Sequence, residues 1–167
     1  MYNAATLLFS NRPTFFSAAV RFLTGGRWSH IDLIDPSDYN YVIGSTGQKG
    51  VHRIKISSRL QSGTTGAVVE VPGLPAQEMA DFIKPWIGAS YDYGGLARFI
   101  LPWHEEDPTK MFCSELIATA ILKVRPDFPV IRKMNASEVT PQDIWRGCRA
   151  ELLQDHVTYV NGREFEI

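Results

Sequence analysis

The chain has 167 residues, of which 44% are hydrophobic, 11% aromatic and 21% charged. This composition is typical of a folded domain with its own apolar core, and it excludes a chain that is disordered throughout. Lys and Arg number 17 against 18 Asp and Glu, so the formal net charge is -1 and no overall positive field attracts nucleic acid. We therefore predict one domain over residues 1–167 and no nucleic-acid partner.

The beginning of the chain and its apolar runs bear on membranes and export. The opening MYNAATLLFS has no basic segment of the kind that starts a signal peptide. No apolar run approaches the ~18 residues that a membrane-spanning helix needs. We expect no transmembrane segment and, by default, a cytoplasmic location, while export by a non-classical or phage-associated route stays open.

Strand patterns dominate the first half of the chain. Alternating apolar and polar residues, bounded by turn-forming residues, predict strands over residues 4–9, 29–34, 41–46, 51–56 and 67–71. The turn-rich DPSDYN between the second and third strands favours a hairpin. After the first strand, Pro13 suits the start of a helix that ends at Gly25 and Gly26. Its apolar residues are Phe15, Phe16, Ala19, Phe22 and Leu23.

Helical spacing of apolar residues dominates the second half. Helices are expected beyond Pro75 to residue 87, over 92–100 with Asp92 as its cap, from just after Cys113 and Ser114 to residue 124, and from Thr140-Pro141 to residue 145. The tail is expected to end in a small hairpin around Asn161-Gly162. Because strands and helices do not alternate regularly, the order of elements indicates an α+β fold with an antiparallel, meandering sheet packed against helices.

Cys113 lies where a nucleophile would be activated. It is part of MFCSELIATAILKV, at the first turn of a predicted helix, where unpaired backbone N–H groups and the helix dipole favour a thiolate. The alternative is structural, since Leu116 and Ile117 follow at helical spacing and the cysteine could continue the buried stripe. Cys148, in WRGCRAELL, has no neighbouring histidine and is interpreted as structural.

His30 is the candidate base. It opens a predicted strand in WSHIDLI and shares a face of that strand with Asp32 rather than with Ile31 and Leu33. An imidazole at a strand end, packed against a helix N-terminus that carries a cysteine, would form a thiolate–imidazolium pair. The alternative is an exposed histidine at a strand edge.

A third residue would orient His30 through its other ring nitrogen. If Ile34 pairs with Tyr41 across the hairpin turn, His30 faces Ser45, which is therefore the first candidate. The remaining candidates are Gly44 or Thr46, after a one-residue slip in register, and Asp32 or His52 nearby.

The other histidines have less support as site residues. His104, in LPWHEEDPTK, falls in a predicted polar loop, and His156 belongs to the tail. No metalloprotease, EF-hand, phosphate-loop or dinucleotide motif is present in the sequence. We therefore expect neither a metal nor a cofactor.

Five segments in this order, WSHIDLI, VIGSTGQKGV, GASYDYGGL, FCSELI and VTPQDIW, resemble the circularly permuted branch of the NlpC-type papain-like cysteine hydrolases, in which the histidine precedes the cysteine. The resemblance implies a papain-like α+β fold, with Cys113 as nucleophile and His30 as base. Asp92 corresponds to a recurrent aspartate of the family that we interpret as a structural cap. The family commonly has Glu, His or another polar residue on the strand after the histidine, where this chain has Gly44-Ser45.

Three functional hypotheses follow from the resemblance, which implies amide or ester hydrolysis by acyl transfer. The first is a thiol peptidase or amidase that cleaves bacterial peptidoglycan, delivered across a membrane by a phage or a secretion apparatus, with an immunity partner left open. The second is a lipid or acyl-amide hydrolase or acyltransferase of the same fold. The third is a catalytically silent structural or binding module of a phage particle. Three aromatic residues are expected to line either kind of cleft: Trp28, Tyr93 and Trp103.

Overall fold

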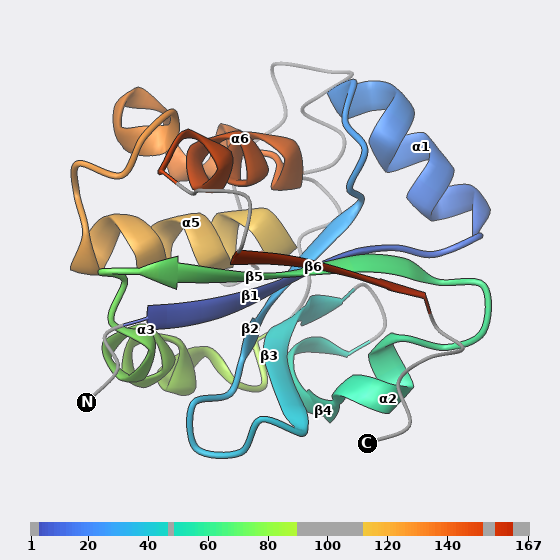
Figure 1. The fold of residues 1–167 in the computed structure, drawn as a ribbon, viewed down its shortest axis with the longest axis horizontal. Coiled ribbons are helices and arrows are strands. Elements are labelled where there is room, and N and C mark those ends of the chain that lie inside the picture. Colours follow the sequence, from blue (N-terminus) through green and yellow to red (C-terminus); the bar gives the residue numbers. More distant parts are fainter. Residues whose placement is uncertain (1–3, 47–48, 90–111, 152–155, 162–167) are drawn as a thin grey trace.

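One antiparallel sheet runs through the computed structural model (Figure 1), which describes residues 4–46, 49–89, 112–151 and 156–161. Its six strands lie in the order β4-β3-β2-β1-β5-β6. The strands are β1 (Ala4–Asn11), β2 (His30–Ile34), β3 (Tyr41–Thr46), β4 (Gly50–Lys55), β5 (Thr65–Pro72) and β6 (Val157–Asn161). The single α+β domain with an antiparallel sheet is therefore confirmed, and β2, β3 and β4 form the predicted meander.

Helices pack on both sides of this sheet. They are α1 (Phe15–Thr24), α2 (Ile56–Arg59), α3 (Ala76–Ile83), α5 (Cys113–Val124) and α6 (Pro141–Glu151), with short 3-10 helices η1 (Lys84–Trp86), η2 (Ile131–Lys133) and η3 (Ala136–Glu138). Figure 1 shows α5 and α6 on one side of the strands and α2 on the other. Helix α5 packs against β2, the strand that begins with His30, and against β3.

The two faces of the sheet bury different residues. Ile31 points into the main core, which also contains the apolar sides of α3, α5 and α6. Ile34 packs on the other face, together with Ile56 at the start of α2. Because successive side chains of a strand alternate between faces, His30 and Asp32 lie on the face of Ile34 and α2.

The predicted helix starts are largely confirmed. Helix α5 begins at Cys113, and α6 begins at Pro141 after Thr140, whose hydroxyl accepts a hydrogen bond from the backbone N–H of Asp143 at 3.1 Å. The helix beyond Pro75 ends at Ile83 and continues as the 3-10 turn η1, which contains Pro85. Proline lacks the N–H that another α-helical turn would need, which explains the change.

Helix α1 ends where predicted, but it begins at Phe15 rather than at Pro13, and its apolar face was misread. Thr14 caps it by accepting a hydrogen bond from the Ser17 N–H at 3.2 Å, and Gly25 ends it in the left-handed region with φ 60°. Phe15 and Phe22 nevertheless lie outside the core, with 92% and 87% of their surface exposed. The sequence showed that the helix is amphipathic, but not which of its faces is buried.

Two further expectations need correction. The strand predicted to reach residue 56 ends at Lys55, and Ile56 begins helix α2, which the sequence analysis missed. Strand β6 pairs with β5, and the hairpin expected around Asn161-Gly162 falls partly outside the described residues. Trp28 is buried against Phe9 and Trp145 rather than exposed.

Several predictions fall on residues outside the described ranges. These are the helix over 92–100 with Asp92, the loop with His104, and the aromatic residues Tyr93 and Trp103. Among the helices that the structure does describe, none has the length and apolar character required to cross a membrane.

Candidate functional site

Cys113 is the first residue of α5, and its side chain is buried. The first hydrogen bond of the helix runs from the Leu116 N–H to the Phe112 carbonyl at 3.0 Å, so the N–H groups before Leu116 have no acceptor within the helix. Ser114 anchors this turn, because its hydroxyl donates a 2.6 Å hydrogen bond to the Val139 carbonyl. The sulfur thus lies at the positive end of a well-anchored helix.

His30, at the start of β2, is held by a carboxylate from its own strand. Its Nε2 lies 2.9 Å from Oδ1 of Asp32, and 16% of the imidazole side chain is exposed. The carboxylate is an acceptor, so Nε2–H donates this bond, and Nδ1 is the nitrogen left for proton transfer. The two residues are adjacent on one strand face, as their spacing in HIDLI predicts.

Arg59 completes the group from the other side of the carboxylate. Its Nη2 donates to Asp32 Oδ1 at 3.0 Å, and its Nε forms an ion pair with Oδ2 at 2.7 Å. Both side chains are buried, with 5% of the arginine and none of the aspartate exposed. A buried carboxylate needs such a partner, because an unpaired charge in the interior is strongly unfavourable.

Electrostatics in this group favour a charged imidazole. Burial alone lowers the pKa of His30, but the Asp32 carboxylate and the negative charge of a Cys113 thiolate more than offset it, so the pKa rises from 6.5 to about 9. Burial likewise raises the pKa of Asp32, but Arg59 and His30 more than offset it and bring the pKa down to about 2. At neutral pH His30 is therefore an imidazolium, and the charge of a Cys113 thiolate is one of the causes that raise its pKa.

The register of the β2–β3 hairpin explains why Asp32 takes this position. Ile34 pairs with Val42, not with Tyr41, so the predicted register is off by one residue and Ser45 does not face His30. Ser45 instead pairs with Val51 of the main core, on the opposite face of the sheet, and is buried there. The register on which Ser45 was chosen is therefore wrong, and Asp32, one of the alternatives, forms the hydrogen bond to His30.

Gly44 makes room for the orienting carboxylate. A β-carbon at position 44 would lie 1.9 Å from Oδ1 of Asp32, which no real structure tolerates. The glycine is thus required by space rather than by backbone conformation. The Gly44-Ser45 pair, which looked like a departure from the family pattern, is explained by a carboxylate that comes from β2 and fills the space above β3.

His52 lies beside this group without joining it. It pairs with Gly44 across β3 and β4, and its Nδ1 donates a 2.8 Å hydrogen bond to the Gly50 carbonyl. Burial is the main cause that lowers its pKa, with Arg59 adding to it, so the ring is neutral near pH 7. This alternative for the third residue therefore has a different hydrogen-bond partner.

The other chemical candidates lie apart from the site. Cys148 is buried in α6, and burial, with Glu151 as a second cause, raises the pKa of its thiol to about 12. It stays protonated, as expected for a structural cysteine. His156 precedes β6, which is separated from β2 in the sheet by β1 and β5.

Arg59 is the site residue that the sequence analysis missed. A strand that places an aspartate among apolar neighbours calls for a buried cation, but nothing local selects one among the 17 Lys and Arg residues. The missing information was the end of β4 at Lys55, since only the helical turn that follows carries the arginine under the sheet.

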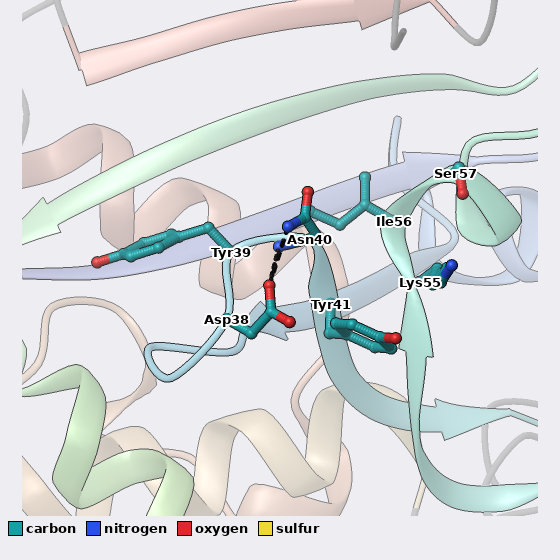
Figure 2. Close-up of a pocket in the computed structure, with 7 residues that line it drawn as sticks. All are labelled: Asp38, Tyr39, Asn40, Tyr41, Lys55, Ile56 and Ser57. Carbon is teal, nitrogen blue, oxygen red and sulfur yellow. Dashed lines mark hydrogen bonds between the residues drawn. The ribbon is translucent and has the colours of Figure 1, made fainter. Parts of the chain in front are cut away.

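A separate cavity of about 400 Å³ opens at the edge of the sheet, between the β2–β3 turn and the junction of β4 with α2. Figure 2 shows its lining residues: Asp38, Tyr39, Asn40, Tyr41, Lys55, Ile56 and Ser57. The Asp38 carboxylate there accepts hydrogen bonds from the Asn40 backbone N–H and side-chain amide, both at 3.0 Å. None of the lining residues belongs to the Cys113–His30–Asp32 group.

Comparison with solved structures finds proteins of similar fold. The protein described as metalloprotein YiiX from Escherichia coli O157:H7, DUF1105, matches with a TM-score of 0.64 over 95% of this chain and 96% of that one, at 16% sequence identity. The likeness is one of fold. No family model matches the sequence, and no curated protein matches it.

Proposed function

We propose that the chain is a cysteine hydrolase of the permuted, papain-like NlpC type, which cleaves an amide bond with a Cys113 thiolate and a His30 imidazolium. The observation that carries the proposal is the buried Arg59–Asp32–His30 chain, in which the pKa of His30 is raised to about 9 by Asp32 and a Cys113 thiolate against the effect of burial. A structural cysteine would not require a charged imidazole nearby. A cysteine nucleophile of the proposed kind does require a charged imidazole, because the imidazolium stabilises the thiolate.

The reaction follows from the roles of these groups. The Cys113 sulfur attacks the carbonyl carbon and forms a C–S bond, while backbone N–H groups of the first turn of α5 stabilise the oxyanion. His30 gives its Nδ1 proton to the leaving nitrogen as the C–N bond breaks, which leaves a thioester. His30 then takes a proton from water, whose oxygen attacks the thioester and releases the acid and the thiolate.

Asp32 supports both halves of this cycle as a positioning residue. Its hydrogen bond fixes the ring so that Nδ1 is available, and its charge stabilises the imidazolium in the resting enzyme. Arg59 keeps the carboxylate ionised and prevents it from accepting the proton that His30 must deliver.

A metal does not fit this site. The structural neighbour is described as a metalloprotein, but the described part of this chain contains no group of three or more His, Cys, Asp or Glu side chains arranged to hold a metal ion. Asp32, the best single ligand, already binds Arg59 and His30 through its oxygens. We therefore derive no step through a metal.

Two substrate classes remain within this proposal. The first is the peptide or amide bond of peptidoglycan, which the resemblance to NlpC-type enzymes suggests. The second is an acyl lipid or acyl-amide, which the exposed phenylalanines of α1 favour because they suit an apolar phase. A catalytically silent module is less well supported, because it rested on the missing third residue, and Asp32 fills that role.

Substitution of the two catalytic groups tests the proposal. Cys113→Ala and His30→Ala should each lower hydrolysis by about 10³-fold or more, while Cys148→Ala serves as the matched control and keeps its activity. Mass spectrometry of muropeptides and assay of fatty acid released from vesicles identify the substrate class. Equal turnover by wild type and Cys113→Ala on a responsive substrate would refute the mechanism.

Alkylation provides an independent test that needs no substrate. At pH 6, iodoacetamide should modify Cys113 and leave Cys148 untouched, since burial raises the pKa of Cys148 to about 12. His30→Ala should slow the modification of Cys113. Failure of Cys113 to react in the folded protein would support the silent module instead.

A further inference from the structure

Helix α1 buries Ser17 and Val20 but leaves two phenylalanines exposed. Its inward side holds Ser17, which is buried and whose hydroxyl donates to Asn11 Oδ1 at 2.9 Å and is also hydrogen bonded to the Ser29 hydroxyl. Its outward side holds Phe15, Ala18 and Phe22, which lie at helical spacing and are all exposed. A soluble domain ordinarily buries the phenylalanines and exposes the serine, so this helix is built to present apolar side chains.

Figure 1 shows α1 at a corner of the molecule, with its outer side not covered by any described element. The polar contacts of Ser17 hold the helix against the segment that leads into β2. The exposed phenylalanines are therefore a stable property of the folded domain. We refer to Phe15, Ala18 and Phe22 as the α1 face.

Arginines flank this face along the chain. Arg12 precedes α1, Arg21 lies in its last turn and Arg27 follows it, whereas the first acidic residue of the whole chain is Asp32. Within the described residues, none of these arginines forms an ion pair with a carboxylate. Arg12 donates to the Gln61 amide oxygen at 2.7 Å, and the Arg27 guanidinium lies 4.9 Å from the centre of the Trp28 ring. Gln61 and the Trp28 ring are neutral, so they do not cancel the positive charges of Arg12 and Arg27.

We propose that the α1 face is a membrane-docking surface that binds the headgroup region of an anionic lipid bilayer. Apolar side chains that enter the interface, flanked by arginines that attract anionic headgroups, are the two components of peripheral membrane binding. A second protein copy would be repelled by the same positive charge on its own α1 face, which is why lipid is the better occupant. This docking goes beyond the proposed hydrolysis and does not depend on Cys113.

Vesicle co-flotation tests the proposal on the full chain. Wild type should float with vesicles of equal parts phosphatidylglycerol and phosphatidylcholine, and much less with phosphatidylcholine alone. Phe15→Ser/Phe22→Ser should reduce the bound fraction by about tenfold or more. The matched control is Tyr39→Ser/Ile87→Ser, which removes two exposed apolar side chains outside α1 and should bind as wild type does.

Charge and self-association provide the remaining arms of the experiment. Arg12→Gln/Arg27→Gln should weaken binding to anionic vesicles and reduce its sensitivity to salt, without involving the phenylalanines. Cys113→Ala should bind as wild type, so a failure of hydrolysis and a failure of docking are distinguishable. Absence of vesicle binding by wild type, undiminished binding by Phe15→Ser/Phe22→Ser, or a dimer that this variant converts to a monomer would each overturn the proposal.

Discussion

Asp32 is the residue on which the chemistry of the site depends most. Its buried carboxylate lies between a guanidinium and an imidazole, so it is ionised down to about pH 2 and holds His30 charged up to about pH 9. Such an arrangement is costly for stability alone, since apolar residues of similar volume would serve as well. The buried Arg59–Asp32–His30 group is explained if the imidazolium takes part in the proposed reaction.

Asp32→Asn should distinguish the effect of the carboxylate on His30 from its effect on the stability of the fold. Without the carboxylate, the pKa of His30 falls from about 9 toward its ordinary value, so the alkaline limb of kcat/KM moves to lower pH. Arg59 is left buried without a partner, and the free energy of unfolding should decrease by about 3 kcal/mol. The measurements are a pH–rate profile and urea unfolding.

Two variants control this prediction. Asp35→Asn breaks another ion pair, with Arg53, and should leave the pH–rate profile unchanged. Ser45→Ala changes the residue that the sequence analysis favoured, and it too should keep the alkaline limb in place because Ser45 lies on the opposite face of the sheet. A shift caused by Ser45→Ala but not by Asp32→Asn would contradict the role given to Asp32.

The single-residue signals in the sequence were partly sufficient. The placement of Cys113 at a helix start and of His30 beside Asp32 on one strand face follows from periodicity alone. The choice between Ser45 and Asp32 could not be made, because it depends on a register that one residue of turn length changes. Arg59 was out of reach, because its position depends on where β4 ends.

Among the helices and strands, α6 is the one whose start is determined most clearly by its local sequence. The Thr140 hydroxyl accepts from the Asp143 N–H at 3.1 Å, and the Asp143 carboxylate accepts from the Thr140 N–H, also at 3.1 Å. These reciprocal bonds satisfy N–H groups at the helix start that have no partner within the helix.

Thr140→Ala should therefore destabilise the protein by about 1 kcal/mol, because the cap at the start of α6 is lost. Urea unfolding measures the change, and Thr140→Ser, which keeps the hydroxyl, is the matched control. Activity should be retained in both variants, since α6 contributes no group to the site. A loss of activity in Thr140→Ala at full folding would show that α6 does more than support α5.

Helix α1 shows the limit of prediction at this scale. Its end at Gly25 follows from the sequence, but amphipathicity defines two faces without stating which one is buried. Here Ser17, which is hydrogen bonded to Asn11 and Ser29, is buried together with Val20. Asn11 belongs to β1 and Ser29 directly precedes β2, and local patterns do not bring these segments together.

At the scale of the whole molecule, the pH dependence of stability should reflect the buried group. The pKa of His30 is raised by folding, so its contribution is complete below pH 6.5 and is lost as the pH rises from 6.5 through about 9. The pKa of Asp32 is lowered, so its contribution is complete above pH 3.8 and is lost as the pH falls through about 2. The free energy of unfolding should therefore peak between these limits.

Denaturant unfolding at a series of pH values measures this dependence. His30→Gln should remove the decline between pH 6.5 and 9, whereas His156→Gln, which lies away from the group, should retain it. A wild-type free energy of unfolding that stays constant from pH 6.5 to 9 would show that the imidazolium is not stabilised by the fold.

The sequence predicts the class of the fold, but not the order of the strands in the sheet. An antiparallel sheet follows from short strands joined by turns, but the central place of β1, between β2 and β5, depends on pairing between segments far apart in the chain. Helix α5 packs against β2 in this sheet. Local sequence patterns predict individual residues of the candidate site, but they do not predict that the fold brings these residues together.

The fit between Asp32 and Gly44 has a consequence for how such chains diverge. The Asp32 carboxylate occupies the volume that a side chain at position 44 would take. Substitutions at positions 32 and 44 are therefore coupled. A lineage that acquires a larger residue at 44 must give up the carboxylate and the charge that holds the base. Loss of the proposed catalysis would then be recorded as a pair of substitutions, and a glycine at this position is expected in relatives that keep the carboxylate.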